Sequence, residues 1–205
     1  RSSEESFREQ GQAVIDAQPE GVIVVPSSLE VTREFTDQLH QKSIPFIMLD
    51  SYMPDLRPLS FFGQDSFCSG FFAAKMLMMI ANKETEIMLM RQTKNGIVVS
   101  KQQDNREVGF RHYMHDHFPQ VKINVLDLPL NGTRSEFNKM LEKYFALHPA
   151  THHCITLTSK AHLVGDFLLK SNRRDVQIMG YDMVEKNARC LREGSISFLI
   201  AQHAY

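Results

Sequence analysis

Polar side chains suited to binding a small polar molecule follow most of the short apolar runs in this sequence. Ser27, Tyr52 and Asp65 follow the first three runs. A carboxylate accepts two hydrogen bonds from a vicinal diol and a guanidinium such as that of Arg106 donates a fork, so this pattern suits a ligand rich in hydroxyls. Turn chemistry explains any one of these residues equally well. The residues after the later runs are Arg91, Gln92, Asn131, Thr158, Ser159, Lys160, Asp182 and Gln202.

The elements that must position these residues alternate between short β-branched or aliphatic runs and longer segments of helical period. This alternation predicts an α/β fold with parallel sheets and crossover helices. Ligands bind such sheets beyond the carboxyl ends of the strands, so we expect the residues above to converge on one rim. Strands are expected at 21–25, 45–49, 59–63, 86–90, 121–126, 153–157, 176–181 and 197–201, and helices at 4–17, 29–41, 65–81, 103–118, 134–146, 161–169 and 184–192.

The chain is expected to form two lobes. Residues 81–85 make a polar break after a very apolar helix, which is where a chain could pass from one lobe to the next. We therefore assign residues 1–83 to an incomplete N-terminal lobe, 84–198 to a C-terminal lobe and 199–205 to a hinge crossover back towards the first. Because the chain opens with a helix and closes soon after a strand, it is expected to be truncated at both ends.

Charge and hydropathy exclude two classes of function. The chain has 205 residues with 23 Lys+Arg against 24 Asp+Glu, so it lacks the basic field that sequence-independent nucleic-acid binding requires. The most apolar stretch, residues 71–81, carries Lys75 and is shorter than the roughly 18 residues that span a bilayer. We expect neither nucleic-acid binding by this segment itself nor a membrane role.

Cysteine and histidine usage gives no sign of a disulfide, metal or other cofactor. The three cysteines, Cys68, Cys154 and Cys190, are far apart, which is typical of free thiols in a reducing compartment such as the cytoplasm. In the histidine-rich segment 111–117, only His112 and His115 share a helical face. The phosphate-binding glycine motifs and the nucleophile elbow are absent, which argues against an enzyme.

Four distinctive segments follow one another along nearly the whole chain, at 63–70, 106–110, 179–182 and 191–196 with Gln202. Together they resemble the effector-binding domain of the LacI/GalR family of transcriptional regulators, which has a two-lobed, type I periplasmic-binding-protein fold. Residues 63–70 resemble its Asp-x-x-x-x-Gly segment and residues 106–110 its Arg-x-x-Gly-Phe helix. Residues 179–182 are similar to its Gly-Tyr-Asp strand end, and 191–196 followed by Gln202 to its last approach to the hinge.

The resemblance implies that Asp65, Arg106, Asp182 and Gln202 contact a sugar or another small effector in a cleft that the loop of Ser27 also lines. The family usually has Asn-Asp where this chain has Ser159 and Lys160, so the ligand need not be a simple neutral sugar. With the strand-end residues added, the expected ligand-binding set is Ser27, Tyr52, Asp65, Arg106, Ser159, Tyr181, Asp182 and Gln202.

The resemblance also implies a mechanism, in which ligand binding closes the lobes and thereby controls DNA binding by a helix-turn-helix headpiece that this chain does not contain. Regulators of this type are commonly homodimers. An exported sugar-binding protein or receptor ectodomain of the same fold is the alternative. An α/β enzyme that uses Asp65 or Asp182 as acid or base is the third hypothesis.

Overall fold

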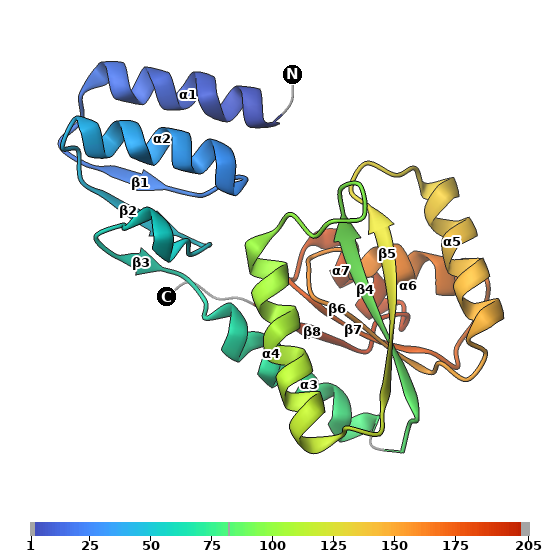
Figure 1. Ribbon diagram of the computed structural model, residues 1–205. Coiled ribbons are helices and arrows are strands. Elements are labelled where there is room, and N and C mark those ends of the chain that lie inside the picture. Colours follow the sequence, from blue (N-terminus) through green and yellow to red (C-terminus); the bar gives the residue numbers. More distant parts are fainter. Residues whose placement is uncertain (1–2, 82, 202–205) are drawn as a thin grey trace. The chain divides into compact units, whose positions relative to one another are not determined.

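The computed structural model describes residues 3–81 and 83–201, which divide into two compact units (Figure 1). The first unit comprises Arg1–Asp65 with Ser100–Gln102, and the second comprises Ser66–Val99 with Gln103–Tyr205. Within the described residues, no helix is both long enough and apolar enough to cross a membrane.

The first unit is a small parallel sheet covered by two helices on one face. Its sheet has the order β1-β2-β3, with Val24 paired to Met48 and Met48 to Phe61. Its core joins Leu39 of α2 and Ile15 of α1 to Met48 of β2. The elements are α1 (Ser3–Ala17), β1 (Val22–Val24), α2 (Leu29–Gln41), β2 (Phe46–Leu49), a 3-10 turn η1 (Pro54–Leu56) and β3 (Phe61–Phe62).

The second unit is a parallel sheet with helices on both faces. The sheet order is β5-β4-β6-β7-β8. Thr133 begins α5 with a capping box, in which its hydroxyl and the carboxylate of Glu136 each accept a backbone N–H. The elements are α3 (Ser66–Ile80), β4 (Glu86–Thr93), α4 (Lys101–His117), β5 (Lys122–Pro129), α5 (Arg134–Leu147), β6 (His153–Thr156), α6 (Ala161–Lys170), β7 (Gln177–Tyr181), α7 (Glu185–Arg192) and β8 (Phe198–Ile200).

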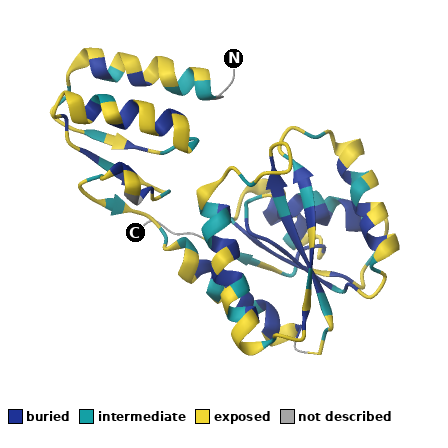
Figure 2. Cartoon of the chain, in the orientation of Figure 1, coloured by how far each residue is buried: buried dark blue, intermediate teal, exposed yellow. Residues whose placement is uncertain are grey.

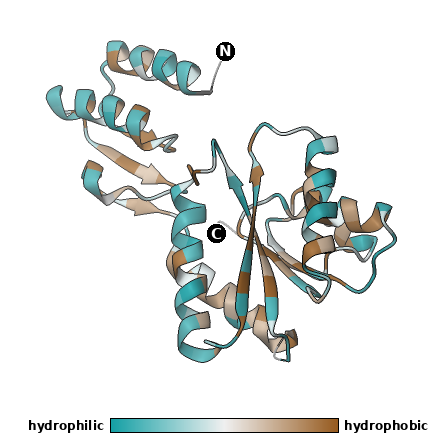
Figure 3. Ribbon diagram, turned by 45° about the vertical axis from the view of Figure 1, so that its right-hand side comes forward, coloured by the Kyte–Doolittle hydropathy of each residue, from teal (hydrophilic) through white to brown (hydrophobic). Residues whose placement is uncertain are grey.

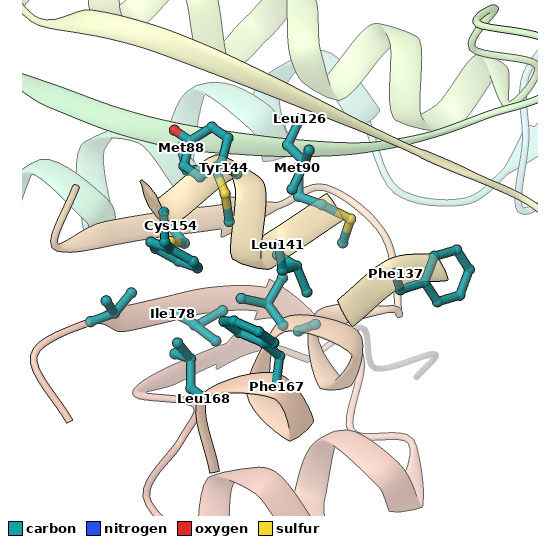
Figure 4. Close-up of a cluster of buried hydrophobic side chains, with 14 of the residues drawn as sticks. Met88, Met90, Leu126, Phe137, Leu141, Tyr144, Cys154, Phe167, Leu168 and Ile178 are labelled. Atoms are coloured by element: carbon teal, nitrogen blue, oxygen red, sulfur yellow. The ribbon is translucent and has the colours of Figure 1, made fainter. Parts of the chain in front are cut away.

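Alternate strand residues pack into two separate cores, one on each face of this sheet. Met88 and Cys154 face α5 and α6, where Figure 4 shows Leu141 and Phe167 in the same cluster. Their neighbours Leu89 and Ile155 belong to the opposite cluster, which α3 and α4 cover. The strands β4 and β6, which carry these residues, are accordingly mostly dark blue in Figure 2, and the sheet carries hydrophobic brown in Figure 3, where α4 is largely hydrophilic.

The strand order creates a topological switch point at β4. The chain runs from β4 to β5 on one side and then crosses to β6 on the other side of β4. The connections that follow two neighbouring strands leave in opposite directions at such a point, so a crevice opens beyond the carboxyl ends of β4 and β6. We therefore look for the ligand site of this unit beyond Thr93 and Thr156.

The glycines of two recognised motifs lie where α3 and α4 cross. A Cβ on Gly70 would lie 1.9 Å from the backbone oxygen of Arg106, and one on Gly109 would lie 2.0 Å from that of Phe67. Any side chain at either position would force the helices apart. The spacing of the Asp-x-x-x-x-Gly and Arg-x-x-Gly-Phe segments is thus a requirement of close helix packing.

The predicted helices and strands agree with the structure within a few residues, and α2 has the predicted bounds. The short turn η1 was not predicted. The division into compact units falls after Asp65, because the apolar face of α3 packs on the second sheet. We expected the first lobe to continue to residue 83. Packing does not decide with which part α3 moves, so the assignment of 1–83, 84–198 and 199–205 stays a prediction. Residues 82 and 202–205 lie outside the described residues.

The α3–α4 crossing can be tested with Gly109→Ala. We expect a loss of several kcal/mol in the free energy of unfolding, because the added methyl group meets backbone that cannot move alone. Gly165→Ala is the matched control in α6, where the nearest atoms belong to side chains at 3.1 and 3.2 Å. Thermal and urea unfolding should give a much smaller loss for the control; equal losses would contradict a special crossing.

The buried His153 predicts a pH dependence of folding. Burial lowers the pKa of His153 from its ordinary 6.5, and the nearby carboxylate of Glu84 offsets part of this effect. Below pH 6.5 the unfolded chain therefore binds a proton that the folded chain resists, so the free energy of unfolding should fall as the pH falls from 7 to 5. His153→Gln should reduce this slope in urea titrations. Parallel wild-type and variant curves would count against it.

Candidate ligand-binding site

Arg106 is held at the carboxyl ends of β6 and β7. It lies on α4 with 1% of its surface exposed, and its Nη1 donates a hydrogen bond to the backbone oxygen of Leu157 at 3.0 Å. Its guanidinium carbon lies 4.0 Å from the ring centroid of Tyr181. A desolvated guanidinium over an aromatic face is stabilised by the ring quadrupole. These contacts fix a positive charge beside the crevice at the switch point.

The ring of Tyr181 packs against the guanidinium of Arg106 and is itself inaccessible to solvent. The side chain is 0% exposed, and its hydroxyl donates to the backbone oxygen of Ser69 at 3.0 Å. The hydroxyl of Ser69 also lies 3.0 Å from the hydroxyl of Tyr181. Burial raises the pKa of Tyr181, with Ser69 and Arg106 acting in the opposite direction. The phenol is therefore neutral, and its hydroxyl is engaged with α3. A buried tyrosine of this kind can orient Arg106 more readily than it can touch a ligand.

Asp182 follows β7 directly and is held in a left-handed backbone conformation. Its φ is +67°, a region that Asp tolerates better than most residues. Its backbone N–H donates to Ile200 at 2.9 Å, and its backbone oxygen accepts from Asn187 Nδ2 at 3.0 Å. The half-buried carboxylate is thus carried on a backbone that is fixed on both sides.

The loop after β6 begins with Leu157, which accepts from Arg106, and goes on with the hydroxyl side chains of Thr158 and Ser159. Asn187 donates to the backbone oxygen of Ser159 at 3.1 Å, which ties this loop to the end of β7. The Thr158 hydroxyl is buried and has no hydrogen-bond partner among the described residues. A buried hydroxyl without a partner costs roughly 1–3 kcal/mol. A ligand that bonds to it would remove this cost.

Arg91 and Gln92, which we expected to follow the strand at 86–90, lie in the last part of β4 and are bonded within the protein. Arg91 makes a bidentate ion pair with Asp127 at 2.7 and 2.8 Å and contacts Glu107 at 3.3 Å, and these carboxylates raise the pKa of Arg91. The side chain of Gln103 donates to the backbone oxygen of Gln92 and accepts from its N–H, both at 3.1 Å. Gln103 thereby fixes the start of α4, which carries Arg106, to the end of β4.

The first unit places its predicted residues after three neighbouring strands. Ser27 is half-buried, and its backbone N–H donates to the Thr32 hydroxyl at 3.0 Å. Tyr52 is 44% exposed and stacks on Phe61, with ring centroids 5.0 Å apart. Asp65 is exposed just before α3. Because β1, β2 and β3 are parallel, their carboxyl ends share one edge. Gln202 lies outside the described residues.

The structure thus joins the predicted residues of the second unit and adds three others. Arg106 contacts Tyr181, and Asn187 links Ser159 to Asp182. Sequence reasoning did not single out Asn187 or Gln103, and it named Thr158 only as one of many polar residues. The sequence offered one indication that Asn187 is buried. It lies on the same side of the predicted helix as the small or apolar residues Ala188 and Cys190, which are buried. No group of side chains in the described part of the chain has the composition of a metal site.

Comparison with known proteins identifies the family. A model of the periplasmic binding protein domain matches residues 1–205. The crystal structure of a candidate LacI transcriptional regulator from Bacteroides fragilis is 43% identical in sequence, and the match covers 98% of this chain and 69% of that chain with a TM-score of 0.89. No curated protein matches the sequence.

Two more distant structures share the fold. A periplasmic sugar binding protein from Legionella pneumophila is 17% identical over 98% of this chain and 74% of that chain, with a TM-score of 0.82. A carbohydrate transporter solute binding protein from Agrobacterium radiobacter, solved with D-arabinose, is 19% identical over 95% and 66% of the two chains, with a TM-score of 0.78. Because the family model matches residues 1–205 and the candidate LacI regulator is 43% identical, the chain is a binding domain rather than an enzyme, and it belongs to the periplasmic binding protein domain family.

Proposed function

We propose that this chain is the ligand-sensing domain of a transcriptional regulator and that it binds a sugar or a similar small polar effector. The observation that carries the proposal is the Arg106 guanidinium, fixed beside the switch point by Leu157 and Tyr181. The regulator role draws on the 43% identity with the candidate LacI regulator from B. fragilis. The choice of a sugar as the ligand is supported by the D-arabinose bound in the A. radiobacter structure.

The groups around Arg106 suit a polyhydroxylated ligand. A guanidinium donates in one plane, the Asp182 carboxylate accepts from paired hydroxyls, and Thr158 and Ser159 can donate or accept. Arg106 is 1% exposed, so a ligand reaches it only when the covering residues move. The exposed Lys160 adds a positive charge to the same loop and favours an acidic or phosphorylated sugar over a neutral one.

Ligand control of DNA binding follows from a two-state domain. A ligand stabilises the state for which it has the higher affinity, and the predicted contacts Ser27, Tyr52, Asp65, Arg106, Asp182 and Gln202 would supply that difference in affinity. We propose that this shift acts on a DNA-binding headpiece outside this chain and that the whole regulator is a cytoplasmic homodimer. The free thiols of Cys68, Cys154 and Cys190 are consistent with a reducing compartment.

An exported sugar-binding protein is the second candidate, because the L. pneumophila and A. radiobacter structures come from transporters. The two candidates differ in what precedes Arg1 in the parent gene: a basic helix-turn-helix for the regulator, a signal peptide for the exported protein. Sequencing that region and then measuring operator binding by the complete protein with and without sugar separates them.

A ligand screen tests the binding proposal directly. Thermal unfolding should be measured with neutral monosaccharides, uronic acids and sugar phosphates, followed by calorimetry on each hit. A sugar present at 100 times its Kd should stabilise the chain by about 2.7 kcal/mol and raise the Tm by several degrees. We expect the strongest effect from an acidic sugar. The absence of any shift across the three classes would overturn a carbohydrate effector.

Arg106→Met tests the residue that carries the proposal. Methionine keeps much of the buried volume while removing the charge and the donors, so it disturbs the fold less than alanine at a fully buried position. Affinity for the hit should fall at least about 30-fold, as expected for a lost charged hydrogen bond of roughly 2 kcal/mol. Arg134→Met is the control, because Arg134 is an exposed partner of Asp166 in the same unit. Unchanged affinity in Arg106→Met would remove the assigned role.

A pair of substitutions at Tyr181 separates support from direct contact. Tyr181→Phe removes the two hydrogen bonds to Ser69 and keeps the ring under Arg106, so it should cost about 1–3 kcal/mol of stability with little change in affinity. Tyr181→Leu also removes the ring and should weaken sugar binding clearly. Both quantities come from urea unfolding and calorimetry. If the Phe variant loses as much affinity as the Leu variant, the hydroxyl contacts the ligand and the supporting role is wrong.

A further inference from the structure

Asn187 is a completely buried amide that joins the two ligand-facing loops of the second unit. It lies in the first turn of α7 with 0% of its surface exposed. Its Nδ2 lies 2.9 Å from the backbone oxygen of Tyr181, 3.0 Å from that of Asp182 and 3.1 Å from that of Ser159, and these three oxygens share its two hydrogens. One side chain therefore holds the chain leaving β7 and the chain leaving β6 at a fixed separation.

The other end of the amide is equally occupied. Its Oδ1 accepts from the backbone N–H of His162 at 2.9 Å and lies 3.0 Å from His162 Nδ1. Oδ1 has no hydrogen to donate, so Nδ1 of His162 carries the proton in this contact. His162 is 7% exposed and begins α6 together with Ala161. The amide thus uses donors and acceptors alike, and it also anchors the helix that follows Ser159.

The backbone that Asn187 holds is the kind that needs an external restraint. Asp182 has a φ of +67°, where a non-glycine residue is strained. The segment 158–160 between β6 and α6 is irregular. A loop without this restraint samples other conformations, and a ligand must then order it at a cost in affinity.

We propose that Asn187, locked by His162, is a positioning residue that sets the separation between Ser159 and Asp182 for ligand binding. This inference rests on the proposed function, because it takes these two residues as ligand contacts. Asn187 itself does not touch the ligand. A side chain with the same shape and no N–H donors should therefore keep the fold and lose the alignment of the loops.

Asn187→Asp is the sharpest variant, because a carboxylate keeps the shape and turns the donated hydrogen bonds into repulsion against the carbonyl oxygens. Thr151→Val is the matched control. Thr151 is also 0% exposed and donates to Glu86 at 2.8 Å, but it lies before the amino end of β6. Both variants lose buried hydrogen bonds and should be less stable than the wild type. Only Asn187→Asp should lose affinity for the best sugar hit, by about 30-fold or more at a temperature where both variants are folded.

His162 provides a conservative rescue. His162→Asn can still donate to Oδ1 of Asn187, since an asparagine amide nitrogen lies close to the position of Nδ1, whereas His162→Leu cannot. The Asn variant should bind sugar nearly as well as the wild type, and the Leu variant should bind several-fold more weakly. A role of His162 in packing alone predicts the reverse order, because leucine fills the buried volume better.

Backbone hydrogen exchange keeps the inference independent of the identity of the ligand. Without sugar, Asn187→Asp should speed exchange at least about tenfold in the segments 158–162 and 181–187, while Thr151→Val leaves them unchanged. Unchanged exchange in those segments, or equal affinity losses in the two variants, would overturn the positioning role. If exchange rises as expected but the wild type binds no sugar, the proposed function is wrong and the inference about loop alignment is not.

Discussion

The second unit depends on keeping one guanidinium charge away from water. A desolvated arginine is costly unless its charge is compensated, and here the backbone oxygen of Leu157 accepts from Nη1 and the guanidinium lies over the face of Tyr181. This arrangement requires α4 to lie against α3, and the helices approach closely because Gly70 and Gly109 carry no side chain. Motif residues far apart in the sequence thus act together in packing. The glycines let the helices approach closely, and the ring of Tyr181 lies against the guanidinium of Arg106 on α4.

The second unit combines buried strands with irregular loops at the strand ends, where a ligand would bind. The strands that carry Leu89 and Ile155 are buried on both faces, so their carboxyl ends are fixed points. The chain leaving β6 and the chain leaving β7 are held by side-chain bonds from Asn187. Loops of this kind open at a lower free energy than the strands beneath them. A binding domain needs this combination of a rigid frame and restrained loops.

Periodicity in the sequence predicted the helices and the strands within a few residues, because these follow from local pattern. It could not predict which residues at the strand ends are accessible, because accessibility depends on contacts between distant segments. Tyr181 illustrates this: it is 0% exposed because it shares a strand face with Met179 beneath α3 and α4, and its contact with a ligand stays a prediction. Counting two residues back along the strand would have indicated burial. Nothing local indicated that Asn187 would bond to three carbonyls.

The buried hydroxyl of Thr158 bears on how such a domain would discriminate among sugars. A site that leaves its own polar group unsatisfied until a ligand arrives rejects any analogue without the matching hydroxyl, since the cost of the empty bond is then retained. A flexible loop would lose this selectivity, because Thr158 could turn to another partner. Thr158 adjoins Ser159, whose backbone Asn187 fixes. Selectivity at this hydroxyl therefore depends on the same amide that aligns the loops, and affinity and specificity should change together when that amide is altered.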